Sequence, residues 1–280
     1  MSVYGMIKDK FIMKDAWQDW EPYRKKLTKL ILDTKPENIL IVGAGRCNDF
    51  DMIGMASVVE SITCIDIDRD SIQSSVGELP QDIQTKIDSE CISLTGISEK
   101  DMETFCDNML MTVRKMGRDI TTESFRYELI SGLNTLKEKL YGSEEELLEH
   151  FRGRAFDTVV CCGVHSQLFA TLSFFLSSLI SSVKEIISEP FDLESELNDM
   201  IREMNAHIIP VINNALKRTA AKTLVFGNEY SPDYPVEGAL QCIEYIRKHM
   251  NPIEKHLDWD FNRAEGIIYD MLIQICIKMV

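Results

Sequence analysis

The stretch that decides the fold is Asn38–Asp70, which begins Asn-Ile-Leu-Ile-Val-Gly-Ala-Gly-Arg-Cys-Asn-Asp and ends Thr-Cys-Ile-Asp-Ile-Asp-Arg-Asp. Ile39–Val42 is a short apolar run rich in β-branched residues, bounded by Pro36 and by glycines, which is typical of a strand buried on both faces. Asp49–Val59 can form a helix, and Ile62–Ile67 is a second apolar run. The order strand, glycine turn, helix, strand predicts a βαβ unit in a parallel sheet.

Two features of this unit indicate a ligand at the ends of its strands. Gly43 and Gly45 follow the first strand, where the chain must turn sharply and bring its backbone close to a ligand. Asp66 follows Gly43 at close to the spacing of about 20 positions at which a carboxylate meets a ribose hydroxyl. Positions 46–48 hold no glycine, so the Gly-x-Gly-x-x-Gly pattern of dinucleotide-binding proteins is not met. The unit therefore favours a ligand that has a ribose but no phosphate, and S-adenosylmethionine fits.

At these residues the sequence resembles the class I S-adenosylmethionine-dependent methyltransferases. Gly43-Ala44-Gly45 is similar to their first motif and Asp66 to the acid that closes their second strand, and the string at 43–51 is similar to a little-described bacterial branch of the superfamily. The resemblance implies an α/β fold: a doubly wound, mostly parallel seven-stranded sheet with an antiparallel C-terminal strand inserted beside the fifth. It also implies in-line methyl transfer, and the acidic net charge of −15 favours a small-molecule or peptide acceptor.

The cofactor site that this resemblance implies draws on four loops. The two glycines would hold the methionine end, Asp66 the ribose hydroxyls, and Asn48 or Asp49 the ammonium. The loop after the third strand, expected at Glu90–Leu94, would contact the adenine. The cofactor-binding candidates are Gly43, Ala44, Gly45, Arg46, Asn48, Asp49, Asp66, Ile67, Gly96, Ile97, Cys162 and Gly163.

The acceptor is expected beyond the fourth and fifth strands, Phe156–Cys162 and Thr223–Phe226, because ligands of open α/β sheets bind at the carboxyl edge. His165, one of five histidines, is the best general-base candidate; a capping or core role is the alternative. Gln167 is a candidate for orienting the substrate. Tyr230, with Glu229 and Tyr234, either lines the substrate pocket or belongs to a solvent-exposed turn.

The domain organisation has two additions to this sheet. Residues 1–35 are predicted to be helical, and Trp20 either packs this segment on the sheet or faces the substrate from a lid. Residues 36–280 are expected to form the cofactor-binding domain, interrupted at 99–150 by a helical insertion between the third and fourth strands. Apolar stripes predict three helices there, with Ser98 and Ser143 as their first and third N-caps.

Composition narrows the function. The net charge of the 280 residues is −15, which argues against nucleic acid as a partner. Eight cysteines without a Cys-x-x-Cys pattern argue against a zinc site and a disulfide framework, and for a reducing cytoplasm. The N-terminus lacks the apolar run of a signal peptide. Thr158–Val183 carries no charge, but hydroxyl residues between its leucines favour a strand and an amphipathic helix over a membrane span. No metal is expected, and the oligomeric state stays open.

Three other functions remain compatible with the sequence. The same βαβ unit could serve an NAD-dependent oxidoreductase, although the missing third glycine counts against it. The same pocket could support transfer of the aminopropyl or aminocarboxypropyl arm of S-adenosylmethionine. A non-catalytic protein could retain the fold and use the helical insertion as a partner surface.

Overall fold

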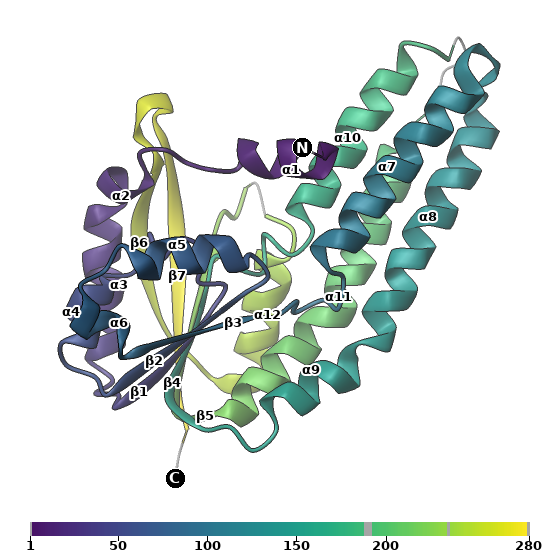
Figure 1. The fold of residues 1–280 in the computed structure, drawn as a ribbon. Coiled ribbons are helices and arrows are strands. Elements are labelled where there is room, and N and C mark those ends of the chain that lie inside the picture. Colours follow the sequence, from purple (N-terminus) through teal and green to yellow (C-terminus); the bar gives the residue numbers. More distant parts are fainter. Residues whose placement is uncertain (1, 188–191, 234–235, 279–280) are drawn as a thin grey trace.

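The computed structural model describes residues 2–187, 192–233 and 236–278, which form one seven-stranded sheet flanked by helices (Figure 1). The strand order is β3-β2-β1-β4-β5-β7-β6. Strands β1 to β5 are parallel, whereas β7 is antiparallel to both β5 and β6. The strands are β1 Asn38–Val42, β2 Ser61–Asp66, β3 Ile87–Cys91, β4 Phe156–Cys162, β5 Ala220–Glu229, β6 Ile253–Asn262 and β7 Ile267–Ile277. The predicted fold class, with a C-terminal strand inserted beside the fifth, is confirmed.

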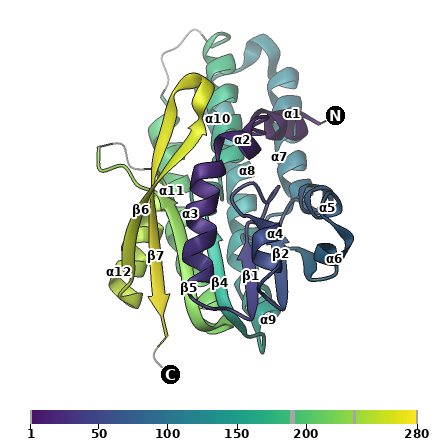
Figure 2. The ribbon, with the colours of Figure 1, turned by 90° about the vertical axis from the view of Figure 1, so that its left-hand side faces the viewer.

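Helices cover both faces of the sheet, which is why its central strands are apolar throughout. In β1, Ile39 and Ile41 face one hydrophobic cluster, while Leu40 and Val42 face the other. The first cluster includes α3 Glu21–Leu32, α4 Met52–Ala56, α5 Arg69–Gly77 and α6 Gln81–Gln84, and these helices lie together in Figure 2. The second includes α12 Ala239–Met250 and the helices of a long bundle.

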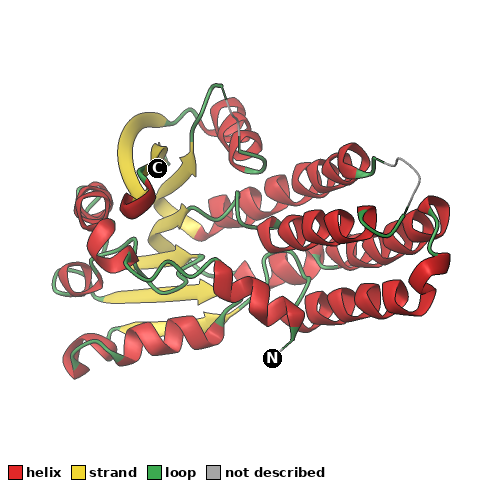
Figure 3. Cartoon of the chain, turned by 90° about the horizontal axis from the view of Figure 1, so that it is seen from above, coloured by secondary structure: helices red, strands yellow, loops and turns green. Residues whose placement is uncertain are grey.

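The helical insertion is confirmed as three helices, α7 Glu99–Met116, α8 Thr122–Gly142 and α9 Glu144–Phe151. They lie beside α10 Ala170–Lys184 and α11 Glu194–Thr219 in one bundle that extends away from the sheet (Figure 3). Buried residues of α7 and α8 belong to the same cluster as Leu40 and Ile65 of the sheet. The insertion therefore shares its core with the sheet. No helix among the described residues is long and apolar enough to cross a membrane.

The predicted caps of the insertion have different outcomes. Ser98 and Asp101 form a capping box at α7, as predicted. Ser143 is the N-cap residue of α9, as predicted, but it makes no cap hydrogen bond, because its hydroxyl donates instead to the carbonyl oxygens of Leu140 and Thr95. Ser143 thus fastens the end of α8 to the loop after β3.

Two strand predictions shift along the chain. The third strand, expected at Glu90–Leu94, is observed at Ile87–Cys91, at the edge of the sheet, where polar residues are accommodated. The fifth strand extends to Glu229, beyond the predicted Phe226, because β7 pairs with it up to that residue. Both shifts change which residues lie at the carboxyl edge.

The N-terminal 35 residues divide into two parts. α3 packs against the sheet beside β6. The short helix α1 Val3–Lys10 instead crosses the carboxyl edge of the sheet and reaches the bundle (Figure 1). Lys8 of α1 pairs with Asp68, just after β2, at 2.9 Å and with Glu99 of α7 at 2.5 Å. α1 therefore connects the edge of the sheet to the insertion.

Leu133→Ala tests whether the insertion and the sheet unfold together. Leu133 of α8 is fully buried, so its truncation should cost about 2–5 kcal/mol. All three tryptophans, Trp17, Trp20 and Trp259, lie outside the bundle. We expect the urea midpoint measured by tryptophan fluorescence to fall with that measured by circular dichroism, and Glu138→Ala, at an exposed position, to change neither. An unchanged fluorescence midpoint in Leu133→Ala would mean that the bundle unfolds separately.

Candidate functional site

A cavity of about 230 Å³ opens at the carboxyl ends of the strands. It lies where the strand order reverses between β1 and β4, which is the usual ligand site of open α/β sheets. Its lining comes from the ends of β1 and β2 and from the loops after β2, β3 and β4: Gly43, Ile65, Asp66, Ile67, Ile92, Ser93, Leu94, Thr95, Gly163, Val164, Gln167 and Leu168. Gly43, Asp66, Ile67, Gly163 and Gln167 are thus brought together.

The first glycine of the turn is required by both conformation and space. Gly43 has a φ of +71°, and a Cβ atom placed on it would lie 2.3 Å from Cγ2 of Val164. Gly45 also has a positive φ, +49°, but a Cβ atom there would meet nothing within 4 Å. Gly43 therefore lets the loop after β4 approach β1 directly above the cavity.

The backbone N–H groups of the turn are already bonded within the protein. Those of Gly43 and Ala44 donate to the carbonyl oxygen of Ile65, at 2.8 and 3.1 Å. The N–H of Gly45 donates to Oδ2 of Asp66 at 2.8 Å. A phosphate held by such a turn needs free N–H groups, so this turn suits a ligand without phosphate.

Asp66 is the polar centre of the cavity. Its Oδ1 accepts a second bond, from the N–H of Asp68 at 2.8 Å. Burial raises the pKa of Asp66, and the two N–H donors partly oppose that rise. A carboxylate has about four lone-pair positions. Two bonds leave Asp66 able to accept hydroxyl groups of a ligand.

Several predicted cofactor residues lie outside the cavity lining. Ala44 is buried and Arg46 is exposed. The backbone oxygen of Asn48 accepts a bond from Arg24 at 2.9 Å. Cys162 is 5% exposed, beneath the site at the end of β4.

Gly96 and Ile97, predicted to contact the adenine, lie outside the cavity lining. A Cβ atom on Gly96 would lie 2.0 Å from Cβ of Ser143, and Ile97 is 3% exposed, so both pack toward the insertion. Residues 92–95 line the cavity in their place. The apolar residues Ile92 and Leu94, which had suggested a strand, are the signal that could have identified them.

His165 lies in the protein interior. It is 1% exposed, and its Nε2 lies 2.9 Å from Oδ1 of Asn213 on α11. Burial lowers the pKa of His165 to about 4, so the ring is neutral near pH 7. A general base must reach the proton that it removes, and this placement favours a positioning role over a catalytic one.

The predicted acceptor residues Trp20 and Tyr230 are engaged in packing. The indole Nε1 of Trp20 donates to the carbonyl oxygen of Phe261 at 3.0 Å. The centroid of its ring lies 4.8 Å from that of Trp259. The ring of Tyr230 lies 5.5 Å from that of His256. Tyr234 lies outside the described residues.

Two carboxylates with raised pKa values interact with each other outside the cavity lining. Asp49 follows the glycine turn, and Glu229 ends β5. Burial, reinforced by the charge of Glu229 and opposed by Arg24, raises the pKa of Asp49 to about 7. Burial also raises the pKa of Glu229, whose Oε1 accepts a bond from Oγ of Ser166 at 2.9 Å. We call Asp49 and Glu229 the acid pair. The sequence had indicated Glu229, with Tyr230 and Tyr234, either as part of the substrate pocket or as part of a solvent-exposed turn.

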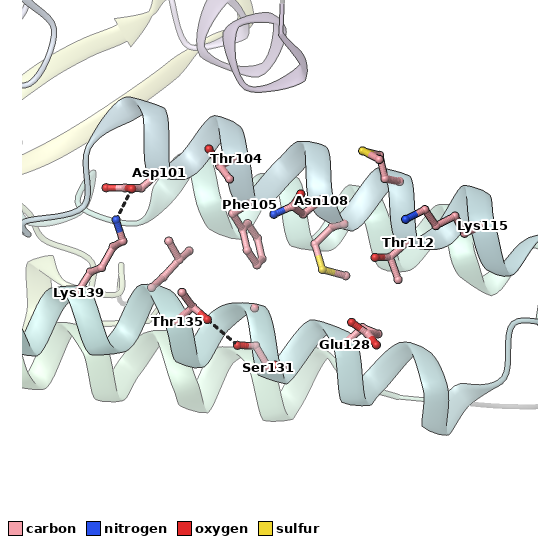
Figure 4. Close-up of a pocket in the computed structure, with 14 residues that line it drawn as sticks. Asp101, Thr104, Phe105, Asn108, Thr112, Lys115, Glu128, Ser131, Thr135 and Lys139 are labelled. Atoms are coloured by element: carbon pink, nitrogen blue, oxygen red, sulfur yellow. Dashed lines mark hydrogen bonds and ion pairs between the residues drawn. The ribbon is translucent and has the colours of Figure 1, made fainter.

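A larger groove of about 450 Å³ lies between α7 and α8, away from the sheet edge (Figure 4). An ion pair between Asp101 and Lys139 borders one end, and Oγ1 of Thr135 donates to the backbone oxygen of Ser131. Size alone would not identify the site, because this groove and a hollow of about 920 Å³ along α8 are both larger than the cavity at the carboxyl ends of the strands. Among the described residues, no group of three or more His, Cys, Asp or Glu side chains is placed to hold a metal ion.

Gly43→Ala should destabilise the protein more than Gly45→Ala does. Both changes force a side chain into positive φ, but only the first also meets Val164. Overpacking of this kind costs about 1–3 kcal/mol. In urea unfolding, we expect the free energy of unfolding of Gly43→Ala to lie below that of Gly45→Ala by this amount. The double variant Gly43→Ala/Val164→Ala should regain the lost stability. Equal destabilisation in both glycine variants would contradict the contact.

The raised pKa of Asp49 predicts that the free energy of unfolding falls as the pH rises from 3.8 to about 7. The folded protein keeps this proton up to about pH 7, whereas the unfolded chain releases it near the ordinary pKa of 3.8, so its contribution is lost between those values. Glu229 acts in the same direction. We expect a higher thermal midpoint at pH 5 than at pH 8, and a smaller difference in Asp49→Asn. The exposed Asp258→Asn should behave like the unaltered protein; a variant Asp49→Asn with undiminished pH dependence would refute the assignment.

Comparisons with known proteins give matches among solved structures, at low sequence identity. No known sequence family matches the chain, and no curated protein does. Among solved structures, the N-methyltransferase NodS from Bradyrhizobium japonicum WM9 is 12% identical, with 94% of this chain and 99% of that chain covered and a TM-score of 0.46. Magnesium protoporphyrin IX methyltransferase (ChlM) from Synechocystis PCC 6803 is 8% identical, with 100% and 98% covered and a TM-score of 0.46. A putative O-methyltransferase from Klebsiella pneumoniae is 12% identical, with 98% and 95% covered and a TM-score of 0.42. At these identities and TM-scores the likenesses carry no argument about this chain, and its fold class rests on the strand order described above.

Proposed function

We propose that the protein is an S-adenosylmethionine-dependent methyltransferase that acts on a small-molecule or peptide acceptor. The observation that carries the proposal is the pairing of Asp66 with a glycine turn whose N–H groups are already bonded. A carboxylate that faces the cavity suits ribose hydroxyls. A turn without free N–H groups suits a nucleoside that carries no phosphate.

The rest of the lining fits the same ligand. Ile65, Ile67, Ile92 and Leu94 give the cavity an apolar wall suited to an adenine ring. The bare backbone at Gly43 and Gly45 would lie against the methionine end. Asp49, just beyond the turn, would receive the ammonium group.

Methyl transfer requires few reactive groups from the protein. When bound, S-adenosylmethionine supplies a methyl carbon whose bond to sulfur breaks, with its electron pair moving to sulfur, as a lone pair of the acceptor bonds to carbon. The protein contributes orientation and the exclusion of water. We propose that Gln167, in the cavity lining, orients the acceptor, and that His165 positions its loop through Asn213.

α1 supports a lid. The cavity of about 230 Å³ is below the ~300–1,000 Å³ typical of small-molecule sites. Tyr4 and Ile7 bury one face of α1 in the core of the bundle, and Lys8 ties it to Asp68 at the edge of the sheet. We propose that α1, within the predicted lid at residues 1–35, moves when ligands enter.

The alternatives fare differently. The bonded turn N–H groups and the absent third glycine disfavour a dinucleotide, and with it an oxidoreductase. Transfer of the aminopropyl or aminocarboxypropyl arm would use the same pocket and would be recognised by the product mass. We also propose a cytoplasmic location, because all eight cysteines are free thiols, as is usual in a reducing compartment.

Asp66→Asn should weaken cofactor binding. A hydrogen bond to a charged group contributes about 1.5–3 kcal/mol, so we expect the Kd for S-adenosylmethionine, measured by calorimetric titration, to rise about tenfold or more. Asp70→Asn, an exposed change on α5, should leave the Kd unchanged. NAD should give no heat of binding with the unaltered protein.

The proposal fails if the unaltered protein binds neither S-adenosylmethionine nor S-adenosylhomocysteine. It also fails if NAD binds in their place. An unaltered Kd in Asp66→Asn would leave the cofactor without its proposed ribose contact and remove the observation on which the proposal rests. Thermal unfolding of each variant shows whether the fold is retained.

A further inference from the structure

Glu229 lies on the opposite side of the β4 loop from the ribose acid. Asp66 ends β2, whereas Glu229 ends β5, and the loop after β4 runs between them because β1 and β4 separate those two strands. Residues Gly163, Val164 and Gln167 of this loop line the cavity, and Ser166 between them bonds Glu229. Glu229 is thus one residue of that loop away from the cofactor cavity, on the side left for the acceptor.

Glu229 is a buried carboxylate with unused bonding capacity. It is 7% exposed, and its Oε2 is buried without a hydrogen-bond partner among the described residues. Its Oε1 is fixed by Ser166. A buried carboxyl oxygen without a hydrogen-bond partner is costly, so its presence here is explained when a ligand completes it.

Among the described residues, no cation is paired with Glu229, and the cation that acts on Asp49 has its donors engaged elsewhere. Arg24 acts on Asp49, but its guanidinium donates to the backbone oxygens of Asn48 and Trp17 and stacks on the Trp17 ring at 3.7 Å. The other groups that interact electrostatically with both acids are Tyr23 and Cys162. Burial raises the pKa of each well above its ordinary value, so both are neutral.

We propose that Glu229 receives a protonated amine of the acceptor, so that the substrate class is that of primary or secondary amines; this inference rests on the proposed function. An anionic acceptor would be repelled by the acid pair. A hydroxyl or thiol acceptor could donate one bond to Oε2 but would leave its charge uncompensated. A cationic nitrogen donates a bond to Oε2 and also compensates the charge of the carboxylate.

The same contact prepares the nitrogen for reaction. A protonated amine has no lone pair, and a nucleophile needs one. Glu229 takes the proton at Oε2, which leaves the acceptor as a neutral amine, while Ser166 keeps Oε1 in place. Asp49 is left to the ammonium of the cofactor, so the two members of the acid pair serve different ligands.

The experiment compares amines with alcohols of the same shape on the full chain saturated with S-adenosylhomocysteine. The probes are butylamine and phenethylamine, with butanol and 2-phenylethanol as their counterparts, at fixed ionic strength. We expect the amines alone to raise the thermal midpoint, with at least a tenfold weaker apparent affinity in Glu229→Gln. Ser166→Ala should show a smaller loss of the same sign.

Two controls separate the site from its alternatives. Asp258→Asn removes one negative charge from an exposed position and should leave the amine response intact, which excludes a general effect of net charge. Glu229→Gln should bind S-adenosylhomocysteine as the unaltered protein does, and its own thermal midpoint should not fall, because an uncompensated buried charge has been removed.

Equal responses to amines and alcohols, no response to either amine, or an undiminished amine response in Glu229→Gln would each overturn the inference while leaving the cofactor assignment in place. Failure of S-adenosylhomocysteine to bind the unaltered protein would instead overturn the proposed function. Incubation with S-adenosylmethionine carrying a deuterated methyl group provides a second readout. A labelled mass in the amines and not in the alcohols supports the proposal, and labelling of the alcohols alone contradicts it.

Discussion

The carboxylate of Asp66 is the interaction on which the candidate site depends. It accepts the N–H groups of Gly45 and Asp68 at 2.8 Å each, and so joins the turn after β1 to the start of α5. The same group faces the cavity. One side chain therefore sets the conformation of the turn and offers the polar contact for a ligand, because a carboxylate has more acceptor positions than the backbone uses.

The carboxyl edge of the sheet has two sides of different chemistry, one at β2 and one at β5. On the β2 side the groups are apolar apart from Asp66 and a few hydroxyls, which suits a nucleoside. On the β5 side lies Glu229, and Ser166 of the intervening loop bonds to it. Two ligands of different chemistry could thus meet at the loop after β4, which is what transfer between a cofactor and an acceptor requires.

The sequence predicted those parts of the structure that local pattern controls. The two-sided apolar runs gave β1, β2 and β4, and the capping residues at Ser98 gave the start of α7. Gly43 and Asp66 were predictable because turn geometry and ligand chemistry restrict those positions. Ile92 to Thr95 were missed because β3 is a polar edge strand, so hydrophobicity marked the loop rather than the strand. The burial of His165 depends on its contact with α11, and the position of Glu229 depends on the pairing of β5 with β7. Neither of these long-range contacts is visible in a local sequence pattern.

The insertion of β7 between β5 and β6 has a consequence for biosynthesis. Until β7 has been made, β5 presents an unpaired edge that includes Leu224, Val225 and Phe226, and such apolar edges readily pair with other chains. β6 cannot protect this edge, since its partner in the sheet is β7. A nascent chain on the ribosome therefore carries an aggregation-prone edge until β7 emerges, and we expect this interval to be when chaperones matter most to its yield.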